Sequence, residues 1–301
     1  MKIPLCVCSI LLLLPSLSVA DTLQEMYAMP TPIEAKDTVF IEQMTWMEAR
    51  DALAAGKTTV IIATGGVEQN GPYMESGAHQ IILKALTDRI ARKLENALVA
   101  PLISYAPEGD IDPPTGHIQY PATLSVSENT FRAILTDAAN SLRVHGYENI
   151  ILIGDSGPNQ KGMKAVAKAL SSEWAHKINK FGENSKIHYI PEYYNNARWN
   201  TWLVAQGYKE TSKPYHDDLR HASILMHADP SSIRYKERKA VALDHLNGID
   251  LSDQKIEQAP SFKSENFNMG KMSRSLRRRN RPSPLAFSVS SPFSDRLISR
   301  F

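Results

Sequence analysis

The stretch TVIIATGGVEQNGPYMESGAHQIILKALTDRIARKL, residues 59–94, decides the fold class. It begins with a continuous apolar run over 59–63, which is typical of a strand buried on both faces of a sheet. A polar, glycine-containing segment follows over 65–79. The apolar residues after it fall at helical spacing: Ile82, Leu83, Leu86, Ile90 and Leu94. The stretch therefore predicts a buried strand, a polar loop at its carboxyl end, and an amphipathic helix over 79–94.

Strand and helix patterns alternate along the rest of the chain. The further elements predicted are helices over 45–55, 127–142 and 161–177 and strands over 97–103, 150–153 and 187–190. Ser127 begins the second of these helices as a favoured N-cap residue. Alternation at this interval is typical of βαβ units, so the sequence predicts an α/β fold, a three-layer α/β/α sandwich around a mostly parallel sheet. Residues 21–40, interrupted by Pro30 and Pro32, are expected to form an irregular arm.

The first twenty residues have the composition of an export signal. Lys2 precedes an apolar run over 10–15, and the small residues Ser18 and Ala20 occupy the positions that a signal peptidase reads. We therefore expect residues 1–20 to be a signal peptide cleaved near Ala20, and the protein to be periplasmic or secreted. A membrane anchor is the alternative, but the run is shorter than the roughly 20 residues that a span needs, so no stable membrane association is expected.

The positions of the cysteines and of the charged residues limit which metal ligands and which partners can be expected. Both cysteines, Cys6 and Cys8, lie in the predicted signal, so the mature chain would hold any metal with His and carboxylate side chains alone. The net charge of +2 hides an uneven distribution, because residues 262–301 contain nine Lys and Arg against two acids. We interpret 261–301 as a basic, disordered tail. Its arginine run could contact a membrane surface or nucleic acid, but the acidic body gives no reason to expect a nucleic-acid partner.

Three polar segments follow predicted strands, at the edge of the sheet where α/β proteins bind ligands: 65–79, 104–121 and 154–160. Glu68 and Asp155 each lie just past a buried strand, and His79 begins a helix. Each has an ordinary explanation, since acids cap helices or form turns and a histidine can cap a helix. Side chains of these types at neighbouring strand ends can also converge on one cation.

A fourth segment, 215–230, is unusually rich in His and Asp. His216 and His221 are five residues apart, and His221 begins an apolar helical pattern. A capping histidine and a surface histidine would explain them equally well, so the segment is not diagnostic alone.

Together these segments resemble the creatininase family. Residues 68–73 resemble the family's Glu-Gln-His-Gly-Pro-His motif, and 117–125 its His-x-x-Phe-Pro-Gly-Thr-Leu-Ser segment. Residues 153–159 align with its Asn-Gly-His-Gly-Gly-Asn turn, and 216–226 with His-Ala-Gly-x-x-Glu-Thr-Ser-x-Met-Leu. The resemblance covers about residues 40–245 with the motifs in family order, and it implies one creatininase-like hydrolase domain over 21–260.

The resemblance also implies a metal site, in an altered form. The family positions that hold one metal correspond to Glu68, His79 and Asp155, where the family has Glu, Asp and His. The exchange keeps two carboxylates and one imidazole, a set that suits zinc and also manganese or iron. Asn70 and His79 replace ligands of the family's second metal, so we expect one divalent ion, with His221 in or near its shell.

By this resemblance the protein would be a metal-dependent amidohydrolase that cleaves a C–N bond in a small amide or cyclic amide. His216 would move a proton to the leaving nitrogen, since histidine titrates near neutral pH. Asn70, Tyr73 and His117 would contact the substrate. The resemblance also implies a homo-oligomer, because members of the family commonly form hexamers.

Two other functions stay open: an inactive small-molecule binding protein on the same scaffold, and a hydrolase of another bond type. The sequence lacks a Gly-x-Ser-x-Gly elbow, a cysteine outside the signal and a phosphate-binding glycine loop, which argues against serine, thiol and nucleotide chemistry.

Overall fold

A computed structural model describes residues 19–71, 73–179, 182, 184–195, 201–202, 204–205, 207 and 219–234. Its sheet has the strand order β2-β1-β3-β4, and every neighbouring pair is parallel. The strands are β1 (Thr59–Thr64), β2 (Ala97–Val99), β3 (Asn149–Gly154) and β4 (Lys186–Tyr189). This arrangement confirms the predicted α/β fold with a parallel sheet.

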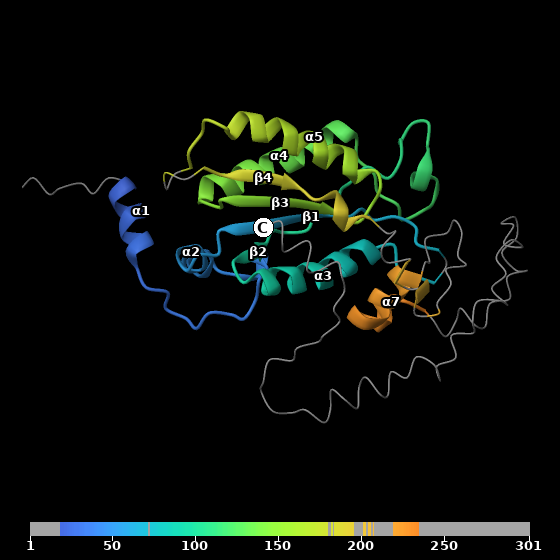
Figure 1. Cartoon of the computed structure of the whole chain (residues 1–301), viewed down its shortest axis with the longest axis horizontal. Helices are drawn as coiled ribbons and strands as arrows, with labels where there is room; N and C mark the ends of the chain where they lie inside the picture. The colour runs from blue at the N-terminus through green and yellow to red at the C-terminus, as the bar shows by residue number, and fades with distance from the viewer. Residues whose placement is uncertain are drawn as a thin grey trace, which may run out of the picture.

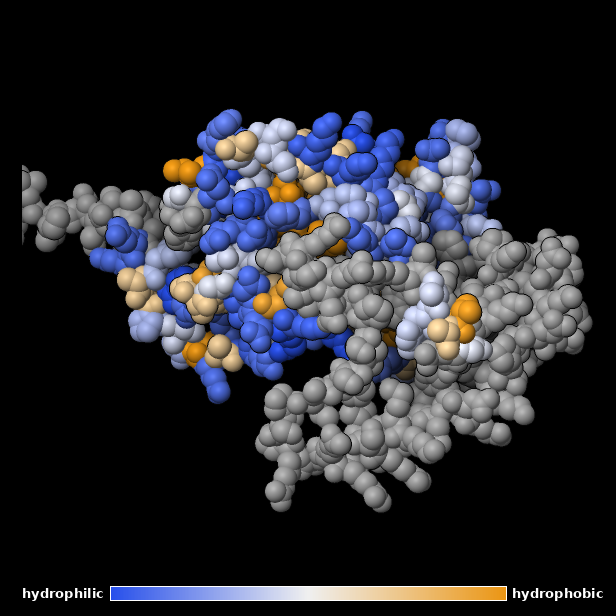
Figure 2. All heavy atoms as spheres, viewed as in Figure 1, coloured by the Kyte–Doolittle hydropathy of each residue, from blue (hydrophilic) through white to orange (hydrophobic). Residues whose placement is uncertain are grey.

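Helices cover both faces of the sheet, as Figure 1 shows. The α4 and α5 helices lie on one face, and α3 lies on the other with α7 packed against it. Their bounds are α3 Ala78–Leu94, α4 Glu128–His145, α5 Asn159–Trp174 and α7 Leu219–Ala228. The outward side of the α4 and α5 layer is mostly hydrophilic in Figure 2, because these helices direct their apolar sides at the sheet.

Successive side chains of a strand point to opposite faces of the sheet, so the apolar core is divided into two clusters, one on each face. Val60 and Ile62 of β1 belong to the core shared with α4 and α5. Ile61 and Ala63 belong to the core shared with α3. All six residues of β1 are buried, which confirms that the continuous apolar run forms a strand covered on both faces.

The predicted helix starts agree with the structure where a capping side chain was recognisable. The Ser127 hydroxyl accepts a hydrogen bond from the Thr130 N–H at the start of α4. Thr45 and Glu48 form a capping box at the start of α2 (Trp46–Ala54). The short 3-10 turns complete the described elements: η1 Ile41–Gln43, η2 Gly116–Gln119, η3 Pro191–Tyr193 and η4 Pro230–Ser232.

Two predicted elements differ from the structure. The strand predicted over 97–103 ends at Val99: Ala100 still donates to the Ile61 carbonyl, Pro101 has no N–H with which to continue the ladder, and Ile103 donates to β1 again. The expected irregular arm begins with a helix, α1 (Val19–Ala28), because no Pro or Gly interrupts that stretch before Pro30.

Within the described residues, no helix combines the length and the apolar character needed to cross a bilayer. Residues 1–18 of the predicted signal, which spans 1–20, and the predicted tail over 261–301 lie outside the described residues.

Candidate metal centre

The two central strands bring the predicted ligands to one edge of the sheet. Asp155 directly follows β3, and its N–H donates to the Thr64 carbonyl at the end of β1. His79 is the second residue of α3, which begins after the loop that leaves β1. Glu68 lies in that loop, where its N–H donates to the Ser76 carbonyl. Because β1 and β3 are parallel neighbours, these side chains meet where both strands end.

His79 lies between the two carboxylates. Its Nδ1 is 3.1 Å from Asp155 Oδ2, and its Nε2 is 2.7 Å from Glu68 Oε1. All three side chains are buried, with at most 2% of each residue exposed. The two ring nitrogens point in different directions, so Glu68 and Asp155 contact opposite edges of the imidazole. The structure therefore brings the three residues together but places only one carboxylate on each nitrogen.

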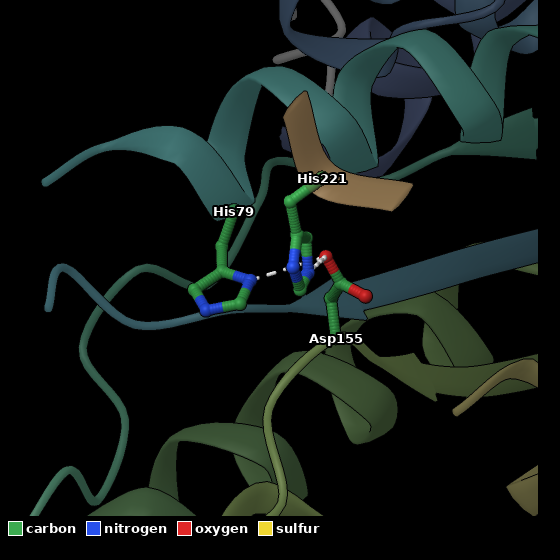
Figure 3. A group of neighbouring side chains, drawn as sticks. All are labelled: His79, Asp155 and His221. Atoms are coloured by element: carbon green, nitrogen blue, oxygen red, sulfur yellow. Dashed lines mark hydrogen bonds and ion pairs between the residues drawn. The ribbon is translucent and has the colours of Figure 1, made fainter. Parts of the chain in front are cut away.

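His221 of α7 completes a group of three possible metal ligands with His79 and Asp155, drawn in Figure 3. One ligand atom from each residue lies within 4.8 Å of the other two, and His221 Nε2 is 3.7 Å from Asp155 Oδ2. Two ligands of a tetrahedral zinc ion with bonds near 2.1 Å lie about 3.4 Å apart. Two imidazoles and one carboxylate at these separations fit a divalent transition metal. Glu68 is not in this group.

The contacts of His79 change its acid–base behaviour. Burial alone would lower the pKa of His79, but hydrogen bonds and charges from Asp155 and Glu68 raise that pKa to about 10. Burial also opposes ionisation of Asp155, yet the nearby His221 imidazole, the hydrogen bond from His79 and the charge of Arg220 hold the pKa of Asp155 well below its usual range. In the absence of a metal, His79 is therefore an imidazolium between carboxylates at neutral pH.

Arg220 adds a second cation to the site. Its Nη2 donates to His221 Nε2 at 2.7 Å, and its Nη1 donates to Asp155 Oδ1 at 3.4 Å. The side chain is buried. Two carboxylates, Glu68 and Asp155, thus face two positive groups, His79 and Arg220.

Glu108 is a site residue that the sequence reasoning missed. It is buried, and its Oε2 accepts a hydrogen bond from Ser156 Oγ at 3.2 Å. Burial, then the hydrogen bond and charge of Glu68, raise the pKa of Glu108 to about 9, so it is a neutral carboxylic acid at pH 7. Gly66 makes room for it, since a Cβ there would meet Glu108 Oε1 at 1.9 Å. The one available sequence signal was its position in a polar segment past a strand.

Replacing Glu108 with glutamine is expected to raise the free energy of unfolding at pH 8 by at least about 1 kcal/mol. Because the pKa of Glu108 is raised on folding, the unfolded chain releases a proton that the folded chain keeps, and stability falls as pH rises from about 4.5 towards 9. The neutral amide removes this loss. Denaturant unfolding at pH 5 and pH 8 should show the gain at pH 8 alone, while Glu42→Gln, at an exposed site, changes neither value. An equal gain at both pH values would contradict the raised pKa.

The three residues predicted to contact substrate lie near Glu68 or in the loop that carries it, but they differ in burial and in their contacts. His117 is partly buried, with Nε2 3.5 Å from Glu68 Oε2 and Nδ1 3.3 Å from Gln69 Nε2. Asn70 is buried, and its amide donates to the carbonyls of Glu68 and Glu75, so it holds the loop that carries Glu68. Tyr73 is buried in the same loop. The predicted proton carrier, His216, lies outside the described residues.

Comparison with known proteins gives a consistent result. The model of the creatininase family, described as creatinine amidohydrolase, matches residues 42–273. A creatinine amidohydrolase of Pseudomonas putida is 27% identical over 116 residues, which are 38% of this chain and 44% of that relative. The aligned part thus spans less than half of that relative's length.

Solved structures show the same fold. A crystal structure of creatinine amidohydrolase (creatininase) superposes with a TM-score of 0.52 at 20% identity, covering 66% of this chain and 75% of the other. A manganese form of creatininase gives a TM-score of 0.50 at 20% identity, covering 65% and 75%. A zinc form of a creatininase mutant gives 0.52 at 20% identity, covering 66% and 75%. At these identities the similarity shows the fold alone.

Proposed function

Since this chain belongs to the creatininase family, we propose that it is a metal-dependent amidohydrolase that cleaves a C–N bond in a small amide or cyclic amide. One observation carries the proposal: His79, Asp155 and His221 place three buried ligand atoms within 4.8 Å of one another at the carboxyl edge of a parallel sheet. A metal ion held there would polarise the substrate carbonyl and lower the pKa of a bound water. Zinc suits these ligands, with manganese or iron as alternatives.

We assign the ion to His79 Nδ1, Asp155 Oδ2 and His221 Nε2, and we give Glu68 a different role from a ligand. Glu68 contacts Nε2 of His79, the nitrogen on the far side from Asp155. A carboxylate in that place accepts the remaining ring N–H, fixes the tautomer and orients Nδ1 towards the ion.

Residues beside the metal ligands would transfer the protons of the reaction. Glu108 keeps its proton at neutral pH and lies against Glu68, so it can store the proton that the leaving nitrogen requires. His117 contacts the other oxygen of Glu68 and is open to solvent on part of its surface, so it connects the site with the outside. His216 stays the proton carrier that the family resemblance suggests.

The inactive binding protein is the second candidate, and one observation favours it. The carboxylates of the site already have positive partners in the His79 imidazolium and the Arg220 guanidinium, so this charge arrangement needs no metal to be stable. Metal analysis separates the two candidates.

Export and assembly are further parts of the proposal. The Lys2-led apolar run and the small residues before Asp21 support a periplasmic or secreted protein cleaved near Ala20. The family resemblance supports a homo-oligomer, with a hexamer as the expected form. We expect the oligomer to act on a small molecule rather than on nucleic acid or a membrane.

The test compares two histidines of one helix. Purified protein loaded with zinc or manganese is expected to hydrolyse members of a panel of small linear and cyclic amides, giving a free amine from the linear ones and a ring-opened amino acid from the cyclic ones. A chelator should reduce the rate at least about 100-fold until the metal is restored. His221→Asn should bind no metal and show no turnover, whereas His227→Asn, at an exposed position on α7, should match the unchanged protein. Metal-free protein that binds amides without cleaving them would establish the binding protein instead.

A further inference from the structure

The contacts of Arg220 differ from those of an arginine that serves only in a structural ion pair. It is 7% exposed, and among the described residues its guanidinium donates to His221 Nε2 at 2.7 Å and to Asp155 Oδ1 at 3.4 Å. A buried arginine usually forms a bidentate pair with a carboxylate. Here the carboxylate contact is single and long, and the short contact goes to an imidazole. The planar fork of Arg220 is therefore left with donors for another acceptor.

The short contact uses the atom that a metal would need. His221 Nε2 has one lone pair, so it cannot accept from Arg220 and bind an ion at the same time. The two oxygens of Asp155 are already divided, with Oδ2 facing the histidines and Oδ1 facing Arg220. A metal on Oδ2 would therefore displace the guanidinium from His221 while leaving it beside Asp155. The freed donors would stay within reach of a group bound at the ion.

A second polar group lies unmatched in the same place. Tyr193 is buried, and its hydroxyl has no hydrogen-bond partner among the described residues. Tyr193 belongs to the apolar cluster that contains Ile151 and Ile153 of β3, the strand that leads directly into Asp155, so it lies on the side of the sheet that carries the site. A guanidinium with donors to spare and a hydroxyl with no partner among the described residues suit an oxygen anion better than a neutral group, because each can donate a hydrogen bond to it.

We propose that Arg220 binds an anionic group of the substrate, so that the substrate class is small amides carrying a carboxylate. With an ion held by His79, Asp155 and His221, the Arg220 guanidinium would leave His221 and bind the carboxylate, with the Tyr193 hydroxyl as a second donor. This inference rests on the proposed metal-dependent function. Arg220 would then have two effects. It would weaken metal binding in the metal-free protein, and it would favour anionic substrates in the metal-bound protein.

The first measurement is the affinity for zinc alone, by competition with a chelator, in the unchanged protein, Arg220→Met and Arg220→Lys. Methionine removes the donor that competes for His221, so Arg220→Met is expected to bind zinc at least about ten-fold more tightly, a difference of about 1.4 kcal/mol. Arg220→Lys keeps the charge and should lie between the two. Thermal unfolding of each variant confirms that it is folded, and the lysine variant serves if the methionine variant is not.

The second measurement uses two probes of nearly equal size on the zinc-loaded proteins, N-acetylglycine and its uncharged amide. The unchanged protein should bind the carboxylate at least about ten-fold more tightly than the amide, and Arg220→Met should lose that preference. Equal zinc affinities, no preference in the unchanged protein, or a preference that survives in Arg220→Met would each overturn the role of Arg220. If no variant binds zinc, the proposed hydrolase function fails first, and this inference fails with it.

Discussion

Replacing Asp155 with asparagine is expected to lower the free energy of unfolding of the metal-free protein by about 3–5 kcal/mol and to abolish metal binding. Asp155 accepts from His79 Nδ1 and from Arg220 Nη1, and all three side chains are buried. Asparagine has the same shape but no charge, so it leaves two buried cations without their shared carboxylate. It also turns one metal-binding oxygen into an amide group that binds zinc poorly.

The matched control is Asp137→Asn, since Asp137 is exposed on the outer side of α4. Its free energy of unfolding should stay within about 0.5 kcal/mol of the unchanged value. Denaturant unfolding of chelator-treated samples measures both variants, and zinc competition measures the loss of the ion. A loss below about 1 kcal/mol for Asp155→Asn would show that Asp155 does not neutralise the buried cations.

The predictable part of the fold is the part that local chemistry determines. The continuous run over 59–63 is typical of a strand buried on both faces, and the structure has that strand as β1. Ser127 marked a helix start because its hydroxyl accepts a hydrogen bond from its own helix. The end of β2 was missed although Pro101 marks it, because the apolar pattern continues to Ile103.

The site was predictable as a set of residues but not as a set of contacts. Topology alone indicates that Asp155, directly after β3, lies at the same edge of the sheet as the loop that leads from β1 to His79. Which ring nitrogen faces which carboxylate depends on side-chain directions that no sequence pattern encodes, so the sequence could not separate the role of Glu68 from that of Asp155. Glu108 and Arg220 were missed for a related reason: an acid in a loop and a base on a helix are usually solvated, and their burial here comes from packing of distant segments.

Zinc affinity is expected to rise about ten-fold for each pH unit between pH 7 and pH 9, about 100-fold in all. The pKa of His79 is raised to about 10, so at neutral pH a proton occupies the nitrogen that the ion needs. Binding must release that proton, and each pH unit below the pKa therefore reduces the apparent affinity by about 1.4 kcal/mol. Zinc affinity rises with pH because the ion replaces a proton on His79, and that proton is easier to remove at higher pH.

Titration calorimetry in buffers of different ionisation enthalpy measures this release, and we expect about one proton per ion at pH 7.5. Glu68→Gln provides the matched variant, because the amide oxygen still accepts from Nε2 while the charge that helps to raise the pKa of His79 is gone. Its affinity should stop rising at a lower pH than in the unchanged protein. If zinc binds without releasing a proton, His79 Nδ1 is not a ligand, and the ion must be held by other groups of the site. Asp155 and His221 would then remain from the proposed set, and Glu68, the other carboxylate in contact with His79, would be the next candidate.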